Sequence, residues 1–148
     1  MKANQMLKTA TLATAVAAIA LIAAAAQAAP SPAAGDLGDV MKDMAKQVLE
    51  ITLNSGDPSK NAASAAFCDS LLGDIATARG LMPPKIQGLP QSQQSGQMAQ
   101  FQGMIDQLSS AVSQMKTDFV NGNNNAVTQD LGEIEGIKQN GHAAFKGQ

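Results

Sequence analysis

The feature that most limits the fold is the spacing of apolar residues between positions 101 and 119. Large apolar residues recur there at alternating intervals of four and three: Phe101, Ile105, Leu108, Val112, Met115 and Phe119. Because an α-helix turns once every ~3.6 residues, this spacing places all of them on one side of a helix. One helix cannot bury such a stripe alone, so the pattern predicts packing against other helices.

Three further segments have apolar stripes at helical spacing. The segment from about residue 36 to 54 carries Leu37, Met41, Met44, Val48 and Ile51. The segment from about residue 58 to 79 carries Cys68, Leu72 and Ile75. The last segment begins between residues 123 and 126 and carries Val127, Leu131, Ile134 and Phe145. No run of alternating polar and apolar residues suggests a strand.

Residues that favour turns separate these segments. Asn54-Ser55-Gly56 follows the first, Gly80 suits the end of the second, and Asn121-Gly122 ends the third. Asp57-Pro58 suits the start of the second helix, and the prolines of residues 81–91 prevent a continuous helix. Short outer connections and one longer middle connection predict an all-α, antiparallel up-down-up-down four-helix bundle.

Residues 1–28 have the features of a secretory signal peptide. Lys2 and Lys8 precede or begin an Ala-rich apolar run, and Ala26-Gln27-Ala28 supplies the small residues of a cleavage site. A retained membrane anchor is the alternative, but the run contains threonines and is followed directly by this site. We expect cleavage, one mature domain at residues 29–148, and no membrane segment in it.

The charge of the predicted mature domain excludes one class of partner. Without Lys2 and Lys8, 8 Lys and Arg stand against 12 Asp and Glu, a net charge of −4. Nucleic acid requires a basic face, so we expect none as partner. The single cysteine, Cys68, cannot form an internal disulfide or the CxxCH pair that attaches haem covalently. Its spacing with Leu72 and Ile75 indicates a core residue.

His142 is the only histidine in the chain and lies about one turn before the end of the last segment. At ~100° per residue it falls about 20° from Leu131, on the apolar face. Met41 lies at a similar distance from the start of the first helix, so this bundle topology brings both side chains to one end. An imidazole and a thioether there can bind a haem iron from both sides. Taken singly, such a Met or His is more often an ordinary core or surface residue.

Several short motifs occur in a characteristic order. Asp36-Leu37, Asp39 and Met41 open the first helix, Pro83-Pro84-Lys85 lies in the middle connection, Phe101 and Ile105-Asp106 lie in the third helix, and His142 with Phe145-Lys146 follows Asn121-Gly122. Their order and spacing resemble the cytochrome b562 family of soluble periplasmic haem b proteins. The resemblance covers essentially the whole predicted mature chain.

The resemblance implies one noncovalent haem b whose iron is ligated by Met41 and His142. The implied haem contacts are Leu37, Met44, Val48, Phe101, Ile105, Ile134 and Lys138. Lys138 stands where the family tends to have Arg, and it could meet a haem carboxylate or be an ordinary solvated charge. Gly141 stands where the family has a larger aromatic residue, which opens the predicted pocket.

We therefore expect a monomeric, periplasmic electron-transfer protein that passes electrons to an unidentified redox protein. We expect no enzyme, because the chain has no Ser/His/Asp set, no spare histidine and no phosphate-binding Gly loop. Two other hypotheses remain open. One is a haem-free helical bundle acting as an adaptor or in a stress response. The other is Cu(I) binding by Met41, Met44 and His142, because soft thioethers suit that ion.

Overall fold

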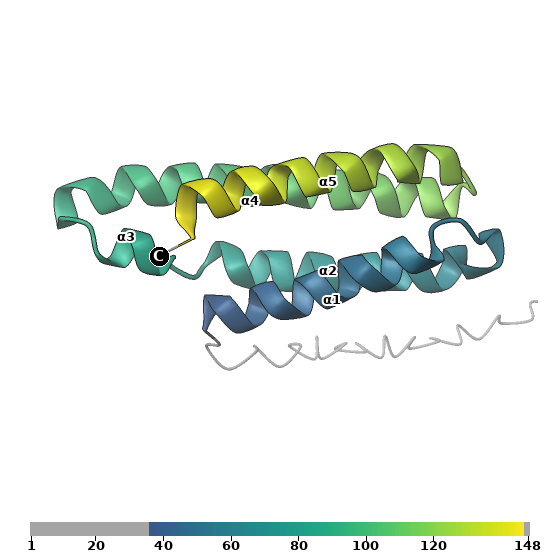
Figure 1. Ribbon diagram of the computed structural model, residues 1–148, viewed down its shortest axis with the longest axis horizontal. Coiled ribbons are helices and arrows are strands. Elements are labelled where there is room, and N and C mark those ends of the chain that lie inside the picture. The colour runs from purple at the N-terminus through teal and green to yellow at the C-terminus, as the bar shows by residue number, and fades with distance from the viewer. Residues whose placement is uncertain (1–35, 147–148) are drawn as a thin grey trace, which may run out of the picture. The chain divides into compact units, whose positions relative to one another are not determined.

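The structure is a computed structural model that describes residues 36–146. The predicted signal peptide lies outside the described residues. Within the described range the chain is helical, without strands (Figure 1). Its elements are α1 (Leu37–Asn54), a 3-10 turn η1 (Pro58–Lys60), α2 (Asn61–Arg79), α3 (Pro84–Gln87), α4 (Gln91–Val120) and α5 (Asn124–Phe145). The prediction of an all-α bundle built on α1, α2, α4 and α5 is confirmed.

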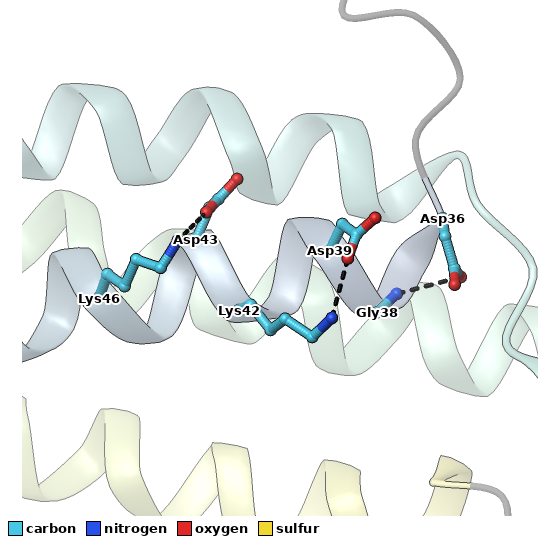
Figure 2. Close-up of polar contacts among 6 residues, drawn as sticks. All are labelled: Asp36, Gly38, Asp39, Lys42, Asp43 and Lys46. Atoms are coloured by element: carbon cyan, nitrogen blue, oxygen red, sulfur yellow. Dashed lines mark hydrogen bonds and ion pairs between the residues drawn. The ribbon is translucent and has the colours of Figure 1, made fainter.

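α1 begins where the sequence pattern predicts. The Asp36 carboxylate accepts a hydrogen bond from the Gly38 amide at 3.2 Å (Figure 2), and so caps the first turn. On the exposed side, Lys42 pairs with Asp39 at 2.9 Å and Lys46 pairs with Asp43 at 2.8 Å. These side chains are too exposed to add much stability. α1 is held mainly by the apolar residues on its other side.

The start of the second helix differs in detail from the prediction. Asp57 acts as a cap, but the turn it caps is η1, where its carboxylate accepts from the Ser59 amide at 2.9 Å. α2 follows directly at Asn61. Gly80 ends α2 with φ −84°, a conformation open to any residue, so a left-handed glycine is not needed there.

The middle connection contains a short helix, α3, that the sequence pattern did not reveal. Pro83 precedes it, and the Pro83 carbonyl accepts from the amides of Ile86 and Gln87 at 2.9 and 3.1 Å. Ile86 is almost fully buried, with 1% of its surface exposed. The prolines do interrupt the long helices as predicted, but one apolar side chain anchors the segment to the bundle.

Neighbouring long helices run antiparallel. α1 packs on α2, α2 on α4, and α4 on α5. Arg79 at the end of α2 pairs with Asp106 near the middle of α4 at 2.7 Å. Asp69, earlier in α2, pairs with Lys116, later in α4, at 2.6 Å. The two ion pairs together define opposite chain directions for α2 and α4.

Part of the core lies toward the end of the bundle where α1 ends and α5 begins. Fully buried side chains there include Ile51, Cys68, Val112, Phe119 and Val127. At this end the Asn124 side chain donates to the Ser55 carbonyl at 2.7 Å and exchanges hydrogen bonds with the Asn61 side chain. α5 is thereby tied to the α1–α2 connection. The prediction that Cys68 is a core residue is confirmed.

Candidate functional site

A cavity of about 610 Å³ opens between α1 and α5 at the other end of the bundle. α1 and α5 do not form one of the closely packed helix pairs. The cavity lies between α1, as far as Val48, and the last half of α5, with α4 contributing to its walls. Its size lies within the usual range for small-molecule and cofactor sites. The bundle therefore holds a ligand-sized space between α1 and α5 at this end.

Met41 and His142 both line this cavity, although they are far apart in the sequence. Met41 comes from the second turn of α1 and is half-buried. His142 comes from the last turn of α5 and is exposed at the cavity. The two helices that carry them are not packed together, so a flat ligand between α1 and α5 would meet a thioether and an imidazole from different sides.

The other residues predicted to contact haem line the same cavity. They are Leu37, Met44, Val48, Phe101, Ile105, Ile134 and Lys138. Phe101 and Phe145 form part of the wall and meet edge to face, with their ring centroids 5.4 Å apart. Edge-to-face packing fixes both rings, and an apolar wall lowers the dielectric around a bound cofactor.

Four charged side chains also line the cavity: Asp36, Lys42, Lys138 and Lys146. Lys138 pairs with Glu135 at 2.6 Å and is about half exposed. This hydrogen bond from Lys138, with a second from Gln139, lowers the pKa of the Glu135 carboxyl. Lys42 is likewise engaged with Asp39. Positive charge is thus available beside the cavity, in positions where water also reaches it.

Some lining residues were not predicted, and Met104 is the most informative. It lies on α4 between Phe101 and Leu108, three residues after one and four before the other, so helical spacing could have revealed it. A Cβ atom built at Gly141 would lie 3.7 Å from the Met104 Cε, an ordinary contact. The Met104 side chain therefore occupies the space beside Gly141. Leu71, Pro83, Pro84 and Ile137 also line the cavity and come from turns or flanking positions, and Leu108 lines it from the predicted stripe of α4.

The described residues contain no group of three or more His, Cys, Asp and Glu side chains that could hold a metal ion. The donors at the cavity are instead one imidazole and the thioethers of Met41, Met44 and Met104. Such a set suits an iron whose remaining ligands are supplied by a porphyrin. The residues present therefore fit haem. Within the described range, no helix combines the length and apolar character needed to cross a membrane.

The fold and the cavity define a class of protein: a four-helix bundle with a cofactor-sized site between its helices. Sites of this kind are common in such bundles, and cytochrome b562 is a standard example of the fold. The sequence matches the family described as Cytochrome b562 over residues 36–146. The chain therefore belongs to the cytochrome b562 family, which comprises haem-binding electron-transfer cytochromes, and the predicted family is confirmed. No curated protein and no solved structure matched the chain.

Proposed function

We propose that this protein is a periplasmic electron carrier that binds one noncovalent haem b, with Met41 and His142 as the axial ligands. The observation that carries the proposal is that both side chains line one cavity from α1 and α5. Haem supplies reversible one-electron chemistry when it is bound. The role of the chain is then to hold haem, set its potential and restrict water.

The two proposed ligands have different effects. A neutral imidazole is a good ligand for haem iron, and the thioether of Met41 favours the reduced metal and raises the reduction potential. With Met41 and His142 both bound to the iron, no position would remain for O₂, which would favour electron transfer over oxygen chemistry. The apolar residues around them, such as Met44, Phe101 and Ile134, exclude water and oppose a change of charge at the metal.

Lys138 is the residue we propose to meet a haem carboxylate. It lines the cavity and lies one helical turn before His142. Its ion pair with Glu135 is half exposed, and such pairs contribute little. Exchange of one carboxylate for another therefore costs little.

The cellular setting is part of the same proposal. The features of residues 1–28 support export to the periplasm and cleavage of the signal peptide. We propose a monomer there, with a redox protein as the partner that delivers or receives the electron. His142 is exposed in the last turn of α5, so a haem bound there would have its edge near such a partner.

The visible spectrum of the purified protein with haem tests the ligand assignment. We expect a low-spin spectrum with resolved α and β bands on reduction. Met41→Ala and His142→Ala should each remove one strong ligand and convert the ferric haem largely to high spin. Met82→Ala is the matched control, because Met82 is exposed on the α2–α3 connection and does not line the cavity. It should leave the spectrum unchanged.

Failure of the wild-type protein to retain haem would reject the proposal and favour a haem-free bundle acting as an adaptor. A low-spin spectrum that survives loss of His142 would reject the assignment of that ligand. Each variant changes a single side chain and should keep the bundle fold. Far-ultraviolet circular dichroism should therefore show the same helix content in each.

Cu(I) binding is a second candidate, favoured by the three methionines and one histidine that line the cavity. Titration with Cu(I) and with haem, each followed by calorimetry, separates the two. Tight Cu(I) binding that depends on Met44 and Met104, together with weak haem binding, would favour copper.

A further inference from the structure

Lys85 of α3 reaches the last turn of α5. Its Nζ donates a hydrogen bond to the Ala144 carbonyl at 2.7 Å, across 59 positions of sequence. Ala144 lies two residues after His142, in the same final turn. Figure 1 shows α3 beside the C-terminal end of α5.

The last turn of α5 needs such a partner. The final carbonyls of an α-helix have no amide one turn further on, and the helix end carries a partial negative charge. The amide of Lys146 satisfies the His142 carbonyl at 3.0 Å, and the backbone becomes extended at Lys146. The Ala144 carbonyl is satisfied by the Lys85 ammonium, which also places positive charge at the negative end of the helix.

α3 is a firm support for this contact. Ile86 and Pro83, on either side of Lys85 along the chain, are both buried. The Pro83 carbonyl accepts two amides of α3, which fixes the turn that presents Lys85. Lys85 itself is exposed and does not line the cavity. The contact that the Lys85 side chain makes beyond α3 is with the last turn of α5.

We propose that Lys85 is a positioning residue, which holds the final turn of α5 so that the imidazole of His142 stays directed at the haem iron. This inference rests on the proposed haem ligation by His142. Without Lys85 the last turn of α5 unfolds more often, and the His142 side chain moves away with it. The ligand on the α1 side, Met41, is unaffected because it lies on a different helix.

Amide hydrogen exchange in the haem-free protein tests the structural step. Lys85→Met removes the donor and the charge while keeping most of the side-chain length. A lysine at a helix end is worth ~0.3–1 kcal/mol, so the amides of residues 143–146 should exchange about two- to fivefold faster. Lys46→Met is the matched control, because Lys46 is exposed and pairs only within α1. It should change none of these rates.

The ferric spectrum of the haem-loaded protein tests the positioning step. Lys85→Met should raise the high-spin fraction, again by about two- to fivefold, because His142 leaves the iron more often. Lys85→Arg keeps a charged donor and should restore the wild-type spectrum. The free energy of unfolding of the haem-free protein should fall by no more than ~1 kcal/mol in Lys85→Met, as expected from loss of this one contact. A larger fall in urea unfolding would show a general loss of stability and would contradict a role confined to the last turn.

The outcomes separate this inference from the proposed function. A wild-type protein that takes up no haem rejects the proposed function, while the exchange comparison still decides whether Lys85 holds the turn. Equal exchange in the wild type and in Lys85→Met overturns the inference. Faster exchange with an unchanged spectrum overturns it too, because the turn would then be held without positioning His142.

Discussion

Asp130 on α5 lies where its negative charge is disfavoured. Burial raises the pKa of its carboxyl, and the nearby charge of Asp118 raises it further. Its Oδ2 is buried without a hydrogen-bond partner. Asp118 is itself buried and accepts from Gln114 at 2.9 Å and from Asn123 at 3.2 Å. The carboxyl groups of Asp118 and Asp130 therefore share a region with few hydrogen-bond donors, and Gln114 and Asn123 both donate to Asp118.

The raised pKa of Asp130 predicts a specific dependence of stability on pH. Folding favours the protonated carboxyl, so this contribution is complete below the unfolded pKa of about 3.9 and is lost as pH rises through the folded pKa. Asp130→Asn supplies a permanent donor and removes the charge. At neutral pH it should increase the free energy of unfolding by on the order of 1 kcal/mol.

Urea unfolding at several pH values measures this effect. The gain from Asp130→Asn should fall toward zero below about pH 4, where the wild-type carboxyl is protonated in both states. Glu50→Gln, at an exposed position of α1, is the control and should show no such trend. A gain independent of pH would contradict the explanation.

Single side chains show what could be read from sequence at this scale. Burial of Cys68 was predicted from spacing alone, and it raises the pKa of that thiol to about 11. The spacing of Met104 with Phe101 and Leu108 could have placed it on the buried side of α4, but spacing does not distinguish a cavity wall from packed core, so its cavity position was not predicted. The contact with Gly141 depends on how α4 and α5 are placed.

The turn between α4 and α5 depends on Gly122. Its φ is +72°, in the left-handed region that a Cβ atom disfavours. Its amide donates to the Phe119 carbonyl at 3.1 Å, which closes the end of α4. Because α5 carries His142, this turn sets the direction of the helix that supplies one side of the site.

Gly122→Ala should lower the free energy of unfolding by about 1–2 kcal/mol, because space is open around the glycine and only the backbone conformation is strained. Gly132→Ala, at an exposed position inside α5 with open space, should instead stabilise by about 0.5–1 kcal/mol. Chemical denaturation of both variants measures the difference. The same sign for both substitutions would contradict this account.

Elements differ in how well their sequences predict them. α4 has a long stripe at regular spacing, and its end at Asn121 and Gly122 was predicted. α3 has only the residues Pro84–Gln87, too short for any periodicity to be recognised. Its helical form depends on the burial of Ile86 against the bundle, which is a tertiary contact.

The molecule as a whole has one end packed by side chains such as Ile51 and Val127, and one end with the cavity between α1 and α5. Asn124 ties α5 to the α1–α2 connection at the packed end, beside Ile51 and Val127. Toward the other end, α1 residues up to Val48 and α5 residues from Ile134 face the cavity. Fewer buried contacts there should make this part of the haem-free protein open more easily.

Hydrogen exchange with and without haem tests this asymmetry. In the haem-free protein, amides of residues 37–48 and 134–146 should exchange faster than those of residues 112–119. Haem binds only the folded state and should slow the first two groups by the larger factor. His142→Ala, which should bind haem more weakly, serves as the control. Equal slowing throughout the bundle would show that the cavity end has no separate stability.

The sequence alone determined the four long helices and the pairing of two distant candidate ligands. Apolar residues at helical spacing can be buried only by helix packing, and turn residues between them require the chain to reverse. Tertiary structure decided that α1 and α5 stay apart over part of their length, that Met104 fills the space beside Gly141, and that Lys85 caps α5. Those features depend on contacts between residues far apart in the chain, which local patterns do not encode.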